Sequence, residues 1–177
     1  MGNRPIAKHA LLLTGGLAVG KTATAQEIVG IAAERGLWVA AIDLDWLGWA
    51  SGGSVSVDEL INRNLALVAA NYSAAGIERL VLARALVSSS NLVAIGGALP
   101  GWKLSVVRLQ APLPTLQKRI RARDSGAELD EHLEEIEEMT RRTNAVAPEA
   151  PVVVNDDGSL RETALAVLRL WDSITHR

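Results

Sequence analysis

The stretch from His9 to Val29 limits the possible folds more than any other part of the chain. An apolar run at Ala10–Leu13 leads into a glycine-rich loop, and helix-compatible residues follow from Thr22 onward. A short apolar run of this kind is typical of a buried strand. Glycines let the backbone curl so that successive N–H groups point at an anion, at the N-terminus of the following helix. We therefore expect a strand, an anion-binding loop and a helix in this order.

The loop fills every fixed position of the phosphate-binding P-loop template, the Walker A motif. Gly15 is followed by four residues and then by Gly20-Lys21-Thr22. In this template the lysine reaches the β- and γ-phosphates of a nucleotide, and the hydroxyl ligates Mg²⁺. The alternative is an ordinary glycine-rich turn, which a complete match between a strand and a helix disfavours. The residues predicted to contact the nucleotide here are Gly15, Gly16, Leu17, Ala18, Val19, Gly20, Lys21, Thr22 and Ala23.

The composition excludes several classes of protein. A chain of 177 residues is near the usual size of one domain, so we expect a single domain over 1–177. The formal net charge of −2 gives no reason to invoke nucleic acid or an anionic membrane as a partner. The absence of cysteine excludes disulfides and thiolate metal sites. No apolar signal region opens the chain and no apolar stretch approaches the roughly 20 residues of a membrane span, so we expect a soluble cytoplasmic monomer or homodimer.

Apolar strand candidates alternate with helix candidates along the whole chain. Continuous rather than alternating apolar runs suit strands buried on both faces of a parallel sheet. The alternation predicts an α/β fold with helices on both faces and right-handed crossovers. The expected strands are 10–13, 37–44, 79–83, 103–109 and 152–154. The expected helices are 23–35, a long one from 56 or 57 toward 76, a short one that follows the capping residues 88–91 and ends near 96–97, and then 113–123, 129–144 and 160–174.

Ligands of such folds bind beyond the carboxyl ends of the strands. This rule places the P-loop, the aspartates that close the second strand, Arg84 and the turn at 155–158 on one edge. We include Asp156 of that turn among the residues expected to contact the nucleotide.

Asp43 and Asp45 form a second group of candidate site residues, after the P-loop. Alternate residues of a strand point to the same side, so both carboxylates are expected to face one cleft. Beside a magnesium-bound nucleotide, one carboxylate can hold the metal through water and the other can accept a proton from an attacking hydroxyl. The alternative is that one aspartate merely caps the following turn.

These features together resemble the P-loop small-molecule kinases. The group includes shikimate, gluconate, adenylylsulfate and nucleoside monophosphate kinases and chloramphenicol phosphotransferase. The shared features are the Gly15–Thr22 loop, the Asp-x-Asp after the second strand, and the basic run Arg119–Arg123 after the fourth. The resemblance implies a three-layer fold with a five-stranded parallel sheet in the order 2-3-1-4-5, and transfer of the γ-phosphate of ATP. The shikimate kinase pattern implies that Asp43 helps to hold Mg²⁺ and that Asp45 contacts the accepting hydroxyl.

The same resemblance assigns the basic cluster. It implies that the helix after the fourth strand leads into a lid, here a short one at about 119–135, whose arginines stack on adenine or reach the transferred phosphate. Arg119 and Arg123 are four residues apart and share one helix face, while Arg121 points elsewhere. A cation at the γ-phosphate offsets charge that spreads over its oxygens in the transition state. The alternative is a solvated basic face that balances the acidic run at 128–138.

The chain departs from the kinase pattern at the third strand. No aspartate closes that strand, and Arg84 stands there instead. An acidic metal ligand therefore has to come from the second strand, which favours Asp43. Arg84 can hold an anionic substrate group, or it can be a structural partner of Asp43 or Asp45; both interpretations stay open.

The resemblance also implies that the acceptor binds at about 46–75, between the second strand and the next helix. Trp46 and Trp49 flank a Ser/Gly loop there, and Arg63 lies on the helix. Aromatic walls with a few polar groups are the usual make-up of a small-ligand pocket. The alternative for each tryptophan is core packing.

The resulting hypothesis is an ATP- and Mg²⁺-dependent phosphotransferase that acts on a hydroxyl of a small molecule. It rests on Lys21, Thr22, Asp43, Asp45 and the pair Arg119 and Arg123. The alternatives are a nucleotide-binding regulatory protein without a phosphoryl acceptor, and a degenerate kinase without catalysis. No Asn-Lys-x-Asp guanine motif occurs in the sequence, which favours ATP over GTP.

Overall fold

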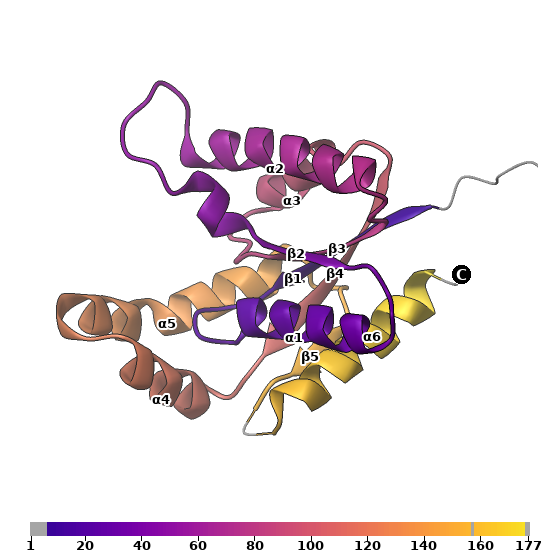
Figure 1. Ribbon diagram of the computed structural model, residues 1–177. Coiled ribbons are helices and arrows are strands. Elements are labelled where there is room, and N and C mark those ends of the chain that lie inside the picture. Colours follow the sequence, from indigo (N-terminus) through magenta and orange to yellow (C-terminus); the bar gives the residue numbers. More distant parts are fainter. Residues whose placement is uncertain (1–6, 157, 176–177) are drawn as a thin grey trace, which may run out of the picture.

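The chain is built on a parallel five-stranded sheet. The computed structural model describes residues 7–156 and 158–175. Within them the strand order is β2-β3-β1-β4-β5, and every pairing is parallel (Figure 1). This confirms the predicted fold class and order. The segment before residue 7 and Asp157 of the predicted turn lie outside the described residues. The strands are β1 (Lys8–Thr14), β2 (Ala40–Asp43), β3 (Arg79–Ala83), β4 (Trp102–Gln110) and β5 (Val152–Val154).

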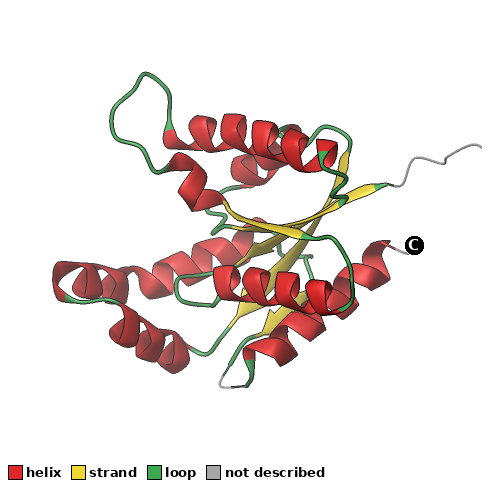
Figure 2. Cartoon of the chain, viewed as in Figure 1, coloured by secondary structure: helices red, strands yellow, loops and turns green. Residues whose placement is uncertain are grey.

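Helices cover both faces of the sheet, which gives three layers (Figures 1 and 2). One face carries α2 and α3, and the other carries α1, α4, α5 and α6. No helix in the described ranges has the length and apolar character that crossing a membrane requires. The helices are α1 (Lys21–Glu34), α2 (Val57–Ala74), α3 (Ser89–Gly97), α4 (Leu113–Arg123), α5 (Gly126–Val146) and α6 (Leu160–Thr175), with a short 3₁₀ helix η1 (Leu44–Gly48).

The central strand β1 shows why the apolar runs are continuous. Leu11 and Leu13 pack into the core shared with α1 and α6, whereas Ala10 and Leu12 pack into the core under α2 and α3. All four side chains are fully buried. Because successive residues of a strand point to opposite faces, a strand with helices on both sides needs apolar residues at every position.

The second strand is shorter than the apolar run that predicts it. Leu37 and Trp38 precede β2 and are 49% and 70% exposed, and the strand ends at Asp43. Asp45 lies in η1 rather than in the strand. The argument from strand alternation was therefore wrong for Asp45, because the chain turns into the 3₁₀ helix directly after Asp43; both carboxylates nevertheless interact with Lys21.

Two leucines on α2 test the account of the core. Leu65 is fully buried and Leu67 is 66% exposed. We expect Leu65→Ala to lower the free energy of unfolding by about 2–5 kcal/mol, because it removes buried methyl groups and leaves a cavity. Leu67→Ala should change it by no more than about 0.5 kcal/mol. Urea unfolding of both variants measures the difference, and equal losses would contradict the assigned packing of α2.

Candidate active site

The P-loop is curved tightly against the ends of β4 and β5. Gly15 has φ +146°, and a Cβ there would lie 2.3 Å from the carbonyl oxygen of Leu109. Gly20 has φ +91°, and a Cβ there would lie 2.5 Å from Asn155 Nδ2. Both approaches are shorter than any side chain allows, so glycine is required by contact as well as by backbone conformation.

The first turn of α1 fits a bound phosphate. The helix begins at Lys21, with no side-chain cap and no acidic residue in its first turn. Its first N–H groups are therefore available to an anion, which the helix dipole also favours. Lys21 Nζ donates to the carbonyl oxygens of Gly15 at 3.1 Å and Gly16 at 2.9 Å, so the ammonium lies over the loop.

The ammonium of Lys21 sits between burial and two carboxylates. Burial lowers the pKa of Lys21 to about 8, while Asp45 and Asp43 oppose the shift. A phosphate placed over the loop would add negative charge and favour the charged form. An anion bound at this position would therefore raise the pKa of Lys21.

Asn155 is a site residue to which the sequence reasoning gave no role. Its Nδ2 donates to the carbonyl oxygen of Val19 at 2.8 Å, and its Oδ1 accepts from Thr163 Oγ1 at 3.0 Å. The side chain is buried and satisfied on both sides. It thereby fastens the P-loop to the first residue after β5. The sequence signal was its place at the carboxyl end of a predicted strand, on the same edge as the loop.

Asp43 joins the P-loop helix to the end of β2. Its Oδ2 accepts from Thr22 Oγ1 at 2.5 Å, and its Oδ1 accepts from the Asp45 N–H at 3.1 Å. Asp43 therefore caps η1 and contacts Thr22 at the same time. Its role as a cap does not exclude a role in holding the metal. A hydroxyl beside a carboxylate is a donor set that suits Mg²⁺, which prefers oxygen ligands.

Asp45 borders a hollow of about 260 Å³ whose other walls are Trp46 and Trp49. The surrounding protein raises the pKa of Asp45 by desolvation, and Asp43 adds to the shift, although 68% of the side chain is open to solvent. The two indoles meet edge to face, with centroids 4.7 Å apart. They are 65% and 79% exposed, so the core-packing alternative was wrong for both.

The two arginines predicted to bind substrate are both engaged with carboxylates. Arg84 is 8% exposed; its Nη2 lies 2.6 Å from Asp58 Oδ1 and its Nε lies 3.7 Å from Asp45 Oδ1. The structural interpretation of Arg84 therefore holds for Asp45. Arg63 pairs with Glu59 on the exposed face of α2 and lines a different hollow, so the structure does not bring it to Asp45.

Arg119 and Arg123 line a second hollow of about 280 Å³, together with Lys21, Thr22 and other residues of the P-loop. Arg119 Nη2 donates to the backbone oxygen of Asp156 at 2.9 Å. The Asp156 carboxylate instead accepts from Thr115 Oγ1 at 2.6 Å, so it turns toward α4. As predicted, the two arginines lie on the same face of α4.

Arg123 is held by a carboxylate that the sequence reasoning missed. Its Nε and Nη2 donate to the two oxygens of Asp124 at 2.5 Å and 2.9 Å. His132 Nδ1 lies 2.7 Å from the same carboxylate. The Arg123 guanidinium holds the pKa of Asp124 well below its usual range, and His132 adds to this. The arrangement ties the start of the predicted lid to α5.

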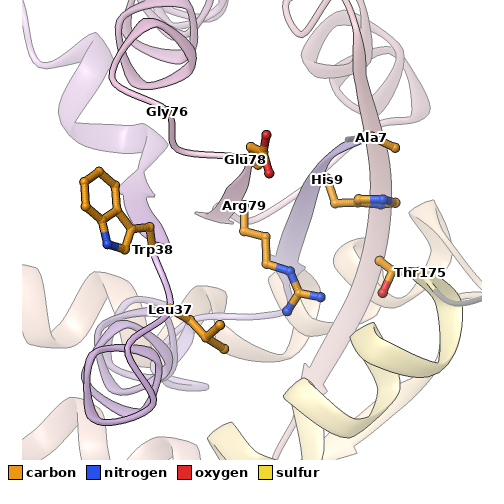
Figure 3. Close-up of a pocket in the computed structure, with 8 residues that line it drawn as sticks. All are labelled: Ala7, His9, Leu37, Trp38, Gly76, Glu78, Arg79 and Thr175. Atoms are coloured by element: carbon orange, nitrogen blue, oxygen red, sulfur yellow. The ribbon is translucent and has the colours of Figure 1, made fainter. Parts of the chain in front are cut away.

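Another hollow lies at the amino ends of the strands, away from the P-loop (Figure 3). It has about 400 Å³ and is bordered by Trp38 after α1, His9 of β1 and Arg79 of β3. These residues stand at the amino ends of their strands. Since ligands of open α/β sheets bind at the carboxyl ends, the edge with the P-loop is the candidate site.

The Asn155 contact generates a testable prediction. We expect Asn155→Ala to lower the free energy of unfolding by about 1–3 kcal/mol, because it leaves buried groups of Val19 and Thr163 without a partner. It should also weaken ATP binding by about tenfold, because the loop loses its fastening. Thr163→Val, which removes only the outer bond, should weaken ATP binding less. Calorimetric titration measures both, and unchanged ATP affinity in Asn155→Ala would contradict the role.

Comparisons with known proteins identify the fold. No protein-family model matches the sequence, and no curated protein matches it. Among solved structures, shikimate kinase from Bacteroides thetaiotaomicron superposes with a TM-score of 0.64 at 19% identity, covering 94% of this chain and 99% of that one. A gluconokinase from Sinorhizobium meliloti gives 0.60 at 19% identity, covering 95% and 96%. The APS kinase of Mycobacterium tuberculosis, in complex with AMPPNP and APS, gives 0.58 at 18%, covering 95% and 99%. The chain has the fold of the P-loop small-molecule kinases.

Proposed function

We propose that the chain transfers the γ-phosphate of ATP to a hydroxyl of a small molecule, with Mg²⁺ as cofactor. The observation that carries the proposal is the position of Asp45. It borders the tryptophan hollow and also interacts electrostatically with Lys21 and Asp43 of the P-loop side. A base between a phosphate cradle and an aromatic hollow is the arrangement that phosphoryl transfer to a hydroxyl requires.

The nucleotide is held by backbone and by cations. Loop N–H groups and the amino end of α1 bind the phosphates, and Lys21 neutralises the β- and γ-oxygens. Arg119 lies half-buried over the loop, where its Nη1 is 3.5 Å from the carbonyl oxygen of Ala18. Arg119 and Arg123 supply positive charge to the γ-phosphate as charge spreads over its oxygens.

Thr22 and Asp43 are the residues that would hold the metal. When bound, Mg²⁺ offsets charge on the phosphate oxygens. The Thr22 hydroxyl would ligate the ion, and Asp43 would hold it through water. Thr22 Oγ1 donates a hydrogen bond to Asp43 Oδ2 at 2.5 Å, so the two oxygens that would hold the metal lie side by side.

Asp45 acts on the acceptor. Its carboxylate takes the proton of the attacking hydroxyl while the hydroxyl oxygen bonds to the γ-phosphorus. The bond between that phosphorus and the β–γ bridging oxygen breaks, and ADP leaves with the electron pair. In this proposal the segment 46–75 binds the acceptor, and 119–135 forms a short lid.

One observation favours a second candidate, a nucleotide-binding protein without transfer activity. The chain has Arg84 where an acidic residue could end β3, and Arg84 is committed to Asp58 and Asp45. A degenerate kinase of this kind would bind nucleotide without dependence on Mg²⁺. The assays below separate the two candidates.

The direct test is ADP formation from ATP with a library of hydroxyl compounds. We expect acceptor-dependent ADP release from the natural chain, and a loss of about 10²–10⁴-fold in Asp45→Asn because the proton acceptor is gone. ATP affinity should stay unchanged in that variant. Glu149→Gln, at an exposed position outside both the lid and the acceptor segment, is the matched control. Normal turnover in Asp45→Asn would remove the base assignment.

The three arginines of α4 provide a matched set. Arg119→Ala and Arg123→Ala should each lower kcat by about 10²-fold or more, because each removes a cation that faces the phosphates. Arg121→Ala should leave kcat unchanged, since Arg121 is not among the residues that line the loop-side hollow. Steady-state kinetics measures all three. Equal effects at the three positions would indicate a general charge effect instead of a site.

The metal assignment is tested at Thr22. Thr22→Val keeps the size of the side chain and removes its hydroxyl oxygen. We expect the Mg²⁺ concentration for half-maximal activity to rise by about tenfold or more, because one direct ligand is lost. Thr24→Val, which alters a buried hydroxyl two residues along α1, should leave the Mg²⁺ requirement unchanged. A requirement that does not move in Thr22→Val contradicts the assignment.

A further inference from the structure

We infer that the acceptor is a small compound with an apolar ring face and no anionic group, bound against Trp46 and Trp49. The inference takes the reaction from the proposed function. The chemistry of the acceptor is argued from separate observations. These are the shape and lining of the hollow beside Asp45, and the pairing of every nearby guanidinium.

The aromatic wall is the first observation. Trp46 and Trp49 stand edge to face with ring centroids 4.7 Å apart, and more than half of each side chain is exposed. Among the described residues, the one charged side chain that lines their hollow is Asp45. Two aromatic walls favour a ligand with an apolar ring, because packing the ring against the indoles removes apolar surface from water. A hydroxyl on the same ligand can then point to the Asp45 carboxylate.

The size of the hollow limits the ligand. Its volume of about 260 Å³ is slightly below the roughly 300 Å³ at which the usual range of ligand pockets begins. A small ring compound fits within this volume.

The charges around the hollow are the second observation. Arg84 is buried and contacts two carboxylates, Asp58 at 2.6 Å and Asp45 at 3.7 Å. Asp58 is held in addition by Asn91 Nδ2 at 2.8 Å, so the pair is fastened from α2, α3 and the end of β3. One guanidinium against two carboxylates leaves an excess of negative charge at this end of the hollow.

No other described cation serves this hollow. Arg63 is paired with Glu59 and lines a separate depression. Lys21 lies over the P-loop and is committed to phosphate in the proposed reaction. A carboxylate or phosphate on the acceptor would lie close to the like charge of Asp45, with no uncommitted cation among the described residues, which disfavours its binding. A neutral or cationic acceptor meets no such penalty, and indole faces attract cations.

The test uses three probes that share a phenyl ring and a benzylic hydroxyl but differ in charge. They are 1-phenyl-1,2-ethanediol (neutral), 2-amino-1-phenylethanol (cationic) and mandelate (anionic). Binding is followed by the indole N–H signals of the ¹⁵N-labelled full chain with Mg²⁺ and AMPPNP present. We expect the neutral and cationic probes to shift the signals of Trp46 and Trp49. The signal of Trp38, which is equally exposed at the opposite edge, should stay in place.

The expected affinities discriminate between the probes. Mandelate should bind at least about tenfold more weakly than the diol, because its carboxylate has no cation. Equal or tighter binding of mandelate at Trp46 and Trp49 overturns the inference. It is also overturned if none of the three probes moves those two signals.

Variants separate the contributions. Trp46→Ala and Trp49→Ala should each weaken binding of the diol by about tenfold, whereas Trp38→Ala should not. All three positions are exposed, so folding should be retained. If the natural chain binds mandelate and Arg84→Gln does not, Arg84 is an anion receptor and the inference is wrong.

The failure of this inference differs from the failure of the proposed function. If the diol binds at the two tryptophans and no phosphate leaves ATP for any hydroxyl compound, the function is wrong and the binding preference stands. If phosphate moves efficiently to an anionic acceptor without a ring, such as glycerate, the function stands and the inference is wrong.

Discussion

The close contact between the P-loop and the ends of β4 and β5 is the constraint on which the rest of the site depends. Gly15 passes the carbonyl oxygen of Leu109 at a distance that no Cβ tolerates, and Gly20 passes the amide of Asn155 in the same way. This packing forces the curvature that aims the first N–H groups of α1 at one point. The place of Lys21 and the approach of Arg119 follow from that curvature, and the proposed phosphate site depends on it.

Asp43 then links this cradle to the acceptor side. It accepts one hydrogen bond from Thr22 of α1 and another from the backbone of Asp45, so a single carboxylate positions both the proposed metal ligand and the proposed base. Arg84 offsets part of the negative charge that this concentration of carboxylates creates. Together with the ammonium of Lys21, this network explains how Asp43, Asp45 and Asp58 coexist near one another.

The sequence predicted those features that depend on local pattern. The continuous apolar strands, the glycine loop and the shared face of Arg119 and Arg123 each follow from residue spacing within one element, and the structure has all three. The turn into η1 could not be derived, because the apolar run continues through Leu44 and hides the end of the strand. The Asn155 bond to Val19 joins residues 136 positions apart, and no local pattern reports such a contact. The exposure of Trp46 and Trp49, and the pairing of Arg63 away from Asp45, likewise depend on tertiary arrangement.

The central claim is that the Gly15–Thr22 loop holds the phosphates of ATP through its backbone and Lys21. Calorimetric titration of Mg²⁺–ATP into the natural chain, Lys21→Ala and Lys103→Ala tests it most directly. Lys103 is an exposed lysine on β4, near the opposite edge of the sheet. The account predicts binding by the natural chain and by Lys103→Ala, and a loss of affinity of about 10²-fold or more in Lys21→Ala. Equal affinity in all three, or no binding by the natural chain, would contradict it.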